Sequence, residues 1–240
     1  APHRVLVHGM ILDDNGKKMS KSLGNVVDPV EQIEKFGINA VRYYFLAGLN
    51  TFQDSSYSES ELINKYNSDL ANNYGNLFAR VTTIAQEIIN NYDIPDDLYN
   101  LDIIKDGRYI GNKYNISALI HYVPESEFIK NANSEIEKAH TELQTNFNVK
   151  NCFSIVNSIV NNANKYYTEN KPYDKLSSNR FVVLIEILYV LKNVSIFYSA
   201  ATPMLGDFFH NYIEKPNIIN KIILYPKINT LKGDYTHIQK

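Results

Sequence analysis

A polar stretch near the N-terminus, residues 16–25, has the composition of a phosphate-binding loop. It carries Lys18 and Lys21 three residues apart, with small hydroxyl residues and glycines around them. On a mobile loop, lysines can neutralise the charge that builds on a leaving pyrophosphate, while hydroxyl and backbone N–H groups position its oxygens. The alternative is a solvated basic hairpin loop without chemistry, which is the commoner fate of a Lys- and Ser-rich segment.

The order of the residues in this loop is more specific than their composition. Residues 16–25 read GKKMSKSLGN, which resembles the KMSKS signature of class I aminoacyl-tRNA synthetases, extended on both sides. The resemblance implies ATP binding by Lys18, Met19, Ser20, Lys21 and Ser22. It also implies that Lys21 is catalytic, stabilising the transition state of adenylate formation, and that Lys18 supports the same charge. Ser20 and Ser22 would be hydrogen-bonding partners.

The same resemblance predicts what surrounds the loop. In the family the signature follows the last strands of a Rossmann-type catalytic domain, and residues 5–12 have the apolar character of such a strand. The family's other signature, HIGH, would lie upstream, and His8-Gly9 does not match it. We therefore expect a C-terminal fragment of a longer enzyme, with the adenine and amino-acid pockets elsewhere and no activity on its own.

A second pair of residues has the chemistry of RNA contacts. Asn76 and Arg80 are four residues apart and share one face of a predicted helix. An amide and a guanidinium together can read base edges and hold phosphate, although a solvated polar face is the usual role of such a pair. Residues 66–80 resemble the first helix of the anticodon-binding domain of methionyl-tRNA synthetases. The resemblance implies that Asn76 and Arg80 contact the anticodon.

Residues 164–173 resemble a further segment of that domain, N-x-Y-x5-P-W, in which the Trp stacks on the first anticodon base. Here Tyr173 takes that place, and the chain contains no Trp. Tyr still offers a ring face for stacking, worth roughly 1–3 kcal/mol per base, but it lacks the indole N–H and some area. The alternative is a half-buried tyrosine that closes a helix. Asn164 and Tyr166 can equally be structural supports.

Composition limits the remaining functions. The 240-residue chain is 44% hydrophobic and 21% charged, which is typical of a globular protein, and its net charge of −2 means that any RNA must bind local patches. A single cysteine, Cys152, excludes a disulfide within the chain and a cysteine-based zinc site, and no metal site is predicted. Glu186 and Lys192 interrupt the apolar residues 181–205, which favours a buried helix over a membrane span.

Apolar spacing and caps predict a mainly α protein. Asp28 before Pro29 predicts a helix that ends at Gly37, and a short helix follows at about residues 39–47. This pair resembles the helices that join the loop to the tRNA-binding domain. Asn39 stands where the family usually has Asp, so we expect a neutral hydrogen bond to Arg42 instead of an ion pair.

A capping-box pattern, Ser58 to Glu61, begins a long amphipathic helix in which Gly75 indicates close packing or ligand approach. Further helices are predicted at residues 126–146, 151–170 and 179–200. The fold class predicted is thus a helical-bundle anticodon-binding domain, residues 58–240, preceded by a small α/β remnant of the Rossmann-type catalytic region, residues 1–57. Residues 91–125 are interpreted as a variable insertion.

These observations favour a fragment of a methionyl enzyme that activates methionine with ATP and Mg²⁺ and charges tRNA(Met). No cofactor is expected to bind tightly to this piece. We expect a monomer without membrane contact, in the mitochondrial matrix, with the cytoplasm as the alternative. Two alternatives stay open: another class I synthetase, cysteinyl or leucyl-like, and a non-catalytic tRNA-binding module that keeps a vestigial loop.

Overall fold

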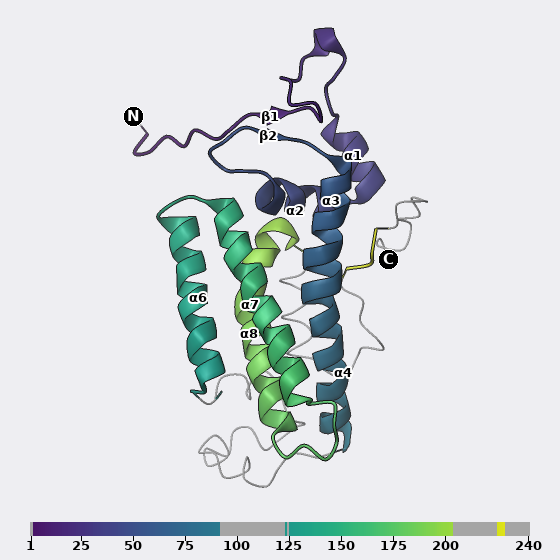
Figure 1. Ribbon diagram of the computed structural model, residues 1–240, viewed down its shortest axis with the longest axis vertical. Coiled ribbons are helices and arrows are strands. Elements are labelled where there is room, and N and C mark those ends of the chain that lie inside the picture. The colour runs from purple at the N-terminus through teal and green to yellow at the C-terminus, as the bar shows by residue number, and fades with distance from the viewer. Residues whose placement is uncertain (1, 92–122, 124, 204–224, 229–240) are drawn as a thin grey trace.

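The computed structural model describes residues 2–91, 123, 125–203 and 225–228. Its main body is a bundle of long helices, and the N-terminal segment forms a small cap at one end (Figure 1). The prediction of a mainly α protein with a small α/β part is confirmed. Most of residues 91–125 and of the tail beyond 203 lies outside the described residues, so the predicted insertion is not addressed.

The bundle begins with one long helical run, as the capping box predicts. Ser58 Oγ accepts a hydrogen bond from the Glu61 N–H at 3.3 Å and starts α3 (Glu59–Lys65). The run continues through η3, a π-helical segment (Tyr66–Gly75), into α4 (Asn76–Asn91). The wider π-helical turns were not predicted, because apolar spacing of three and four indicates an α-helix and gives no signal for a π-helical segment within it.

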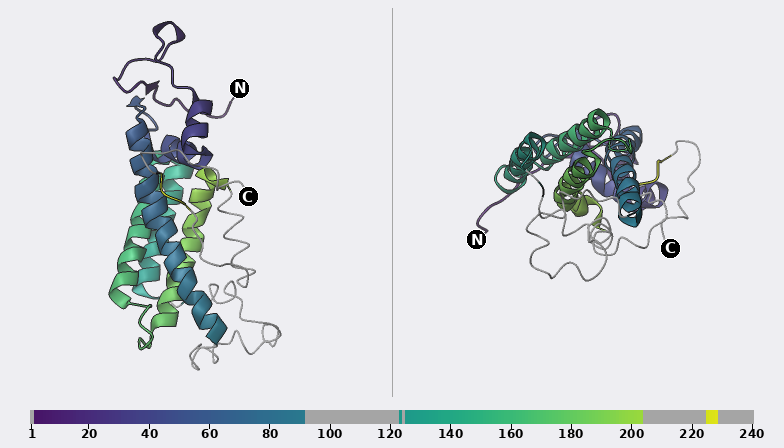
Figure 2. Two further views of the ribbon diagram at one scale, coloured as in Figure 1. Left: turned by 90° about the vertical axis from the view of Figure 1, so that its right-hand side faces the viewer. Right: turned by 90° about the horizontal axis from the view of Figure 1, so that it is seen from below.

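Three more helices complete the described bundle: α6 (Glu127–Gln144), α7 (Val149–Asn170) and α8 (Arg180–Ala201). Their bounds agree with the predicted ranges to within a few residues. Seen end-on, α4, α6, α7 and α8 run roughly alongside one another (Figure 2). Each of α4, α6 and α7 contacts α8, which is buried over most of its length. By length and composition α8 could cross a membrane, yet its packing confirms the prediction of a buried bundle helix.

Two short helices join the cap to the bundle, and Arg42 fixes their position. Asp28 accepts a hydrogen bond from the Val30 N–H at 2.8 Å and caps α1 (Pro29–Phe36), and α2 (Ile38–Tyr43) continues into η2 (Tyr44–Gly48). The predicted bond between Asn39 and Arg42 is wrong. Arg42 instead donates to the carbonyls of Ala201 and Ala200, at 3.0 and 2.7 Å. A cation is favoured there because the C-terminal carbonyls of a helix carry partial negative charge.

The predicted strand over residues 5–12 is mostly wrong. Only β1 (Ile11–Leu12) is a strand, paired in parallel with β2 (Ser55–Ser56), and residues 5–7 are exposed. Residues 5–12 do include residue types that favour strands. A strand also needs a neighbouring strand along its length, and β2 pairs with only two of these residues. Gly9 lies so close to the Gln53 backbone that any side chain there would overlap it.

A buried polar network joins the connecting helices to the bundle. The Tyr43 hydroxyl and the Asn157 amide both donate to Asp69 Oδ2 at 2.8 Å, and the Tyr198 hydroxyl donates to Asn157 Oδ1 at 2.6 Å. Lys65 forms an ion pair with the same Asp69 oxygen at 2.8 Å. Burial raises the pKa of Tyr43 and of Tyr198 well above the ordinary value, so both hydroxyls stay protonated as donors. A fully satisfied network of this kind favours one fixed junction geometry.

Gly75 provides a test of the packing at the end of the π-helical segment. A Cβ there would lie 2.9 Å from the Leu70 carbonyl oxygen and 3.2 Å from Tyr225 Cδ2. We expect Gly75→Ala to lower the free energy of unfolding by about 1–3 kcal/mol through overpacking, although Ala is the better helix former. Urea unfolding measures this, with Asn72→Ala at a nearby exposed position as the control. A Gly75→Ala protein as stable as the wild type would contradict it.

Candidate functional site

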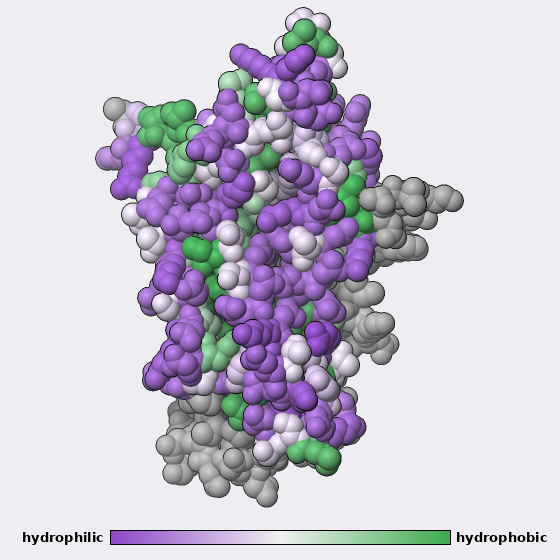
Figure 3. Space-filling model, viewed as in Figure 1, coloured by the Kyte–Doolittle hydropathy of each residue, from purple (hydrophilic) through white to green (hydrophobic). Residues whose placement is uncertain are grey.

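The loop of residues 16–25 projects from the end of the molecule, beyond β1 (Figure 1). A tight turn forms its base, where the Gly16 N–H donates to the Asp13 carbonyl at 3.0 Å and the Asp13 N–H donates to the Lys17 carbonyl at 2.9 Å. Gly16 has a φ of 75°, a conformation that glycine after asparagine commonly adopts in a tight turn. Hydrophilic side chains cover most of the face shown in Figure 3, including much of this loop.

Asp13 and Asn25 hold the two ends of the loop together. One carboxylate oxygen of Asp13 accepts the N–H groups of Asn15 and Lys17 at 3.0 and 2.7 Å, and the other accepts the Asn25 amide at 2.8 Å. The Asn25 side-chain oxygen accepts the Ser20 N–H at 2.9 Å. The Asn25 bond, followed by the Lys17 N–H, lowers the pKa of Asp13 below its usual value. The sequence analysis did not predict this pair.

The five signature residues divide into exposed and anchored ones. Lys18 and Lys21 are exposed, and in the described parts of the chain neither ammonium group forms an ion pair. Met19 is partly buried and packs against the hydrophobic core. Ser20 Oγ accepts the Leu23 N–H at 3.3 Å, and so begins η1 (Lys21–Leu23). Ser20 Oγ also lies 3.2 Å from Ser22 Oγ. The two cations are therefore presented to solvent on a braced loop.

A second cluster forms where α4 faces the end of α7. The Arg80 guanidinium carbon lies 4.0 Å from the ring centroid of Tyr167, and the Tyr167 and Tyr173 rings are 5.8 Å apart at 37°. Tyr173 is 51% exposed, and Asn76 is exposed one helical turn before Arg80. The structure thus brings Arg80 and Tyr173 together through Tyr167. The α7–α8 connection that carries Tyr173 lies at the far end of the bundle from the loop of residues 16–25 (Figure 1).

The end of α7 sets the position of Tyr173. Lys171 adopts a left-handed conformation, with a φ of 45°, and its N–H donates to the Tyr167 carbonyl at 3.1 Å. Pro172 is buried, and the Asp174 N–H donates back to the Lys171 carbonyl at 2.9 Å. This reversal of the chain returns the ring of Tyr173 to the last turn of α7. Pro is common directly after such a helix end because it cannot continue the helix.

Tyr167 was missed by the sequence analysis. Its place on the apolar stripe of α7, with Val156, Val160 and Ala163, predicts burial but not contact with Arg80. By contrast, Asn164 and Tyr166 make contacts within the bundle, as expected if they are structural supports. Asn164 donates to Asn73 Oδ1 at 2.7 Å, and the Tyr166 hydroxyl donates to the buried Glu186 at 2.6 Å.

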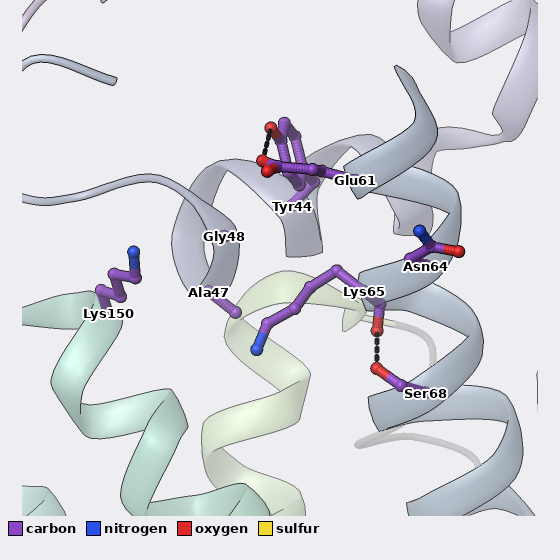
Figure 4. Close-up of a pocket in the computed structure, with 8 residues that line it drawn as sticks. All are labelled: Tyr44, Ala47, Gly48, Glu61, Asn64, Lys65, Ser68 and Lys150. Carbon is purple, nitrogen blue, oxygen red and sulfur yellow. Dashed lines mark hydrogen bonds between the residues drawn. The ribbon is translucent and has the colours of Figure 1, made fainter. Parts of the chain in front are cut away.

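A pocket of about 430 Å³ opens where η2 meets α3 and the start of α7 (Figure 4). Its polar groups are largely engaged within the protein. The Tyr44 hydroxyl donates to Glu61 at 3.3 Å, and Lys150 Nζ donates to Asn50 Oδ1 at 2.9 Å. Burial raises the pKa of Tyr44 to about 12. We assign no ligand to this pocket, and among the described residues no cluster of His, Cys, Asp and Glu could hold a metal ion.

The clamp between Asp13 and Asn25 predicts a pH-dependent loop. The folded pKa of Asp13 is lowered, so its stabilising effect is present above the ordinary carboxyl value, about pH 4, and is lost as pH falls through the lowered value. We expect the backbone amide signal of Lys17 to shift and broaden in that acidic range by NMR.

At neutral pH, Asp13→Ala is expected to speed tryptic cleavage after Lys17, with Asp14→Ala as the control; equal cleavage of both variants would contradict the clamp.

Comparison with known proteins finds relatives of one kind, the methionine–tRNA ligases. A family model described as tRNA synthetases class I (M) matches residues 1–82. Methionine–tRNA ligase of Ureaplasma parvum is 30% identical over 217 residues, covering 90% of this chain and 37% of the relative. Methionine–tRNA ligase of Rhizobium meliloti is 49% identical over 92 residues, covering 38% of this chain and 17% of the relative. The chain therefore spans well under half the length of both relatives.

Solved structures show the same fold. Methionyl-tRNA synthetase of Mycobacterium tuberculosis in its apo form superimposes with a TM-score of 0.65 at 19% identity, over 95% of this chain and 44% of that one. A LeuRS structure from Agrobacterium radiobacter reaches 0.57 at 18% identity, over 92% of this chain and 24% of that one. The fold alone thus does not separate the two synthetases, whereas the sequence relatives do. The chain is thus similar in sequence to methionine–tRNA ligases over 90% of its length, and it shares the fold of methionyl-tRNA synthetase.

Proposed function

We propose that the full-length protein is a methionine–tRNA ligase, and that this chain supplies its phosphate-binding loop and its recognition of the anticodon. The observation that carries the proposal is the placement of two clusters at opposite ends of one bundle. The loop of residues 16–25, which carries Lys18 and Lys21, lies at one end, and the α7–α8 connection, which carries Tyr173, lies at the other (Figure 1). Arg80 contacts Tyr167 in the last turn of α7. A helical run from residue 59 to 91 spans roughly 50 Å. A nucleotide cannot reach both clusters, but a folded RNA can.

The loop would act on ATP. Lys21 and Lys18 would neutralise the phosphate charge that grows as pyrophosphate leaves, together with the Mg²⁺ that accompanies ATP as substrate. Met19, Ser20 and Ser22 would complete the contacts to the nucleotide. Because Asp13 and Asn25 brace the base of the loop, its lysines can be held over the phosphates at a lower cost in conformational entropy.

The second cluster would read the anticodon of tRNA(Met). The exposed face of Tyr173 offers a stacking surface for a base, and the Arg80 guanidinium offers donors for a base edge or a phosphate. Asn76, exposed on the same face of α4, would add an amide that can pair with a base edge. We further propose a monomer in the mitochondrial matrix, with the cytoplasm as the alternative compartment.

A charging assay tests the proposal against its alternatives. The full-length protein is expected to attach methionine to tRNA(Met), and not leucine or cysteine to their tRNAs. Charging with leucine or cysteine would establish another class I enzyme, and the absence of any charging would favour a non-catalytic tRNA-binding module. Residues 1–240 alone are expected to form no adenylate, so methionine-dependent ATP–pyrophosphate exchange by this piece would refute that part.

A further inference from the structure

We infer that Tyr167 is a positioning residue that orients both Arg80 and Tyr173 for the RNA. This inference rests on the proposed function, because it deepens the assignment of that cluster. Tyr167 lies between the other two side chains, with the Arg80 guanidinium 4.0 Å from its ring centroid and the Tyr173 ring 5.8 Å away. Only 3% of Tyr167 is exposed, so it acts on the RNA through its neighbours.

The position of Tyr167 is fixed from two directions. Its side chain belongs to the buried apolar stripe of α7, and its carbonyl accepts the Lys171 N–H at 3.1 Å, which closes the helix. The same closure sets the path of the chain to Tyr173, through the buried Pro172. The ring of Tyr167 is therefore a rigid platform, whereas the side chains on either side of it are at least partly exposed.

The platform matters most for Arg80, whose side chain has several rotatable bonds. Stacking of the planar guanidinium on a ring restricts those bonds while its N–H donors still point outward in the plane. Among the described residues, the Arg80 guanidinium contacts the Tyr167 ring and forms no hydrogen bond, so its N–H donors can bind RNA. Ordering these donors before RNA arrives lowers the entropy lost on binding, which increases affinity without a new contact.

The test compares two substitutions of Tyr167 in the full-length protein. Tyr167→Leu removes the ring and is expected to weaken tRNA(Met) binding about tenfold, whereas Tyr167→Phe keeps the ring and is expected to stay within about twofold of wild type. Phe128→Leu is the matched control. Phe128 belongs to α6, and its ring stacks on the ring of Tyr166 with 4.0 Å between the ring centroids, so it is part of a different aromatic pair. Wild-type affinity in Tyr167→Leu, or equal losses in the Leu and Phe variants, would overturn the inference.

A double-mutant cycle separates positioning from general stability. If Tyr167 acts through Arg80, Tyr167→Leu should cost less affinity in an Arg80→Ala background than in the wild type. Arg80→Lys probes the same contact without altering the core. We expect it to weaken tRNA(Met) binding about fivefold, because Lys keeps the charge but cannot stack a planar group on the ring. Additive effects of Tyr167→Leu and Arg80→Ala, or wild-type affinity of the Arg80→Lys protein, would overturn this inference but not the anticodon assignment. Full affinity in both Arg80→Ala and Tyr173→Ala would overturn the anticodon assignment as well.

Discussion

Replacing Lys21 by alanine in the full-length protein is expected to slow methionine-dependent ATP–pyrophosphate exchange by about 10²–10³-fold. Lys21 is exposed on a braced loop, and its ammonium group makes no ion pair within the described ranges. Its loss would remove stabilisation of the phosphate charge at the point where that charge develops, so kcat should fall. The affinity for tRNA(Met) should change much less than the exchange rate, because the proposed anticodon contacts are made by the other cluster and stay intact.

Lys17→Ala is the control for this experiment. Lys17 is also an exposed lysine of the same loop, but it lies just outside the five-residue signature. Its backbone N–H, which alanine retains, forms the bond to Asp13 at 2.7 Å. Exchange by the Lys17→Ala enzyme should therefore remain close to that of the wild type. An unchanged exchange rate in Lys21→Ala would contradict a role in phosphate chemistry and would favour the non-catalytic tRNA-binding module.

The second large effect is expected from Tyr173→Ala. Stacking of one base on an aromatic ring is worth roughly 1–3 kcal/mol, so the dissociation constant for tRNA(Met) should rise by about tenfold or more. Methionine activation should be spared. The control is Leu176→Ala, because Leu176 lies in the same connection and is 93% exposed. Equal losses of tRNA binding and methionine activation in Tyr173→Ala would mean that this side chain only supports the fold.

Local signals predicted the helices well. Asp28 with Pro29 and Ser58 with Glu61 fixed two helix starts, because a cap is a contact between residues two or three apart. The apolar run of residues 181–205, interrupted by Glu186 and Lys192, identified α8 as a buried helix. Such features depend on neighbours in sequence, so they can be recognised before any tertiary contact is known.

The contacts that shape the candidate sites were harder to predict because they join distant residues. Arg42 reaches the end of α8, and Asn157 meets Tyr43 across the bundle. Arg80 is 87 positions from Tyr167 in sequence, yet its guanidinium lies over that ring. The resemblance led to Arg80 and Tyr173, but it gave no reason to consider the residue between them. Likewise, the loop signature drew attention to its lysines and not to the Asp13–Asn25 clamp.

The most direct test of the central claim is the charging of two tRNA(Met) transcripts that differ only in the anticodon. The full-length enzyme should charge the CAU transcript with methionine at a much higher kcat/KM than the altered one. The Tyr173→Ala and Arg80→Ala variants should lose most of that preference while still activating methionine. Equal charging of both transcripts by the wild-type enzyme would contradict the account, because this bundle would then not read the anticodon.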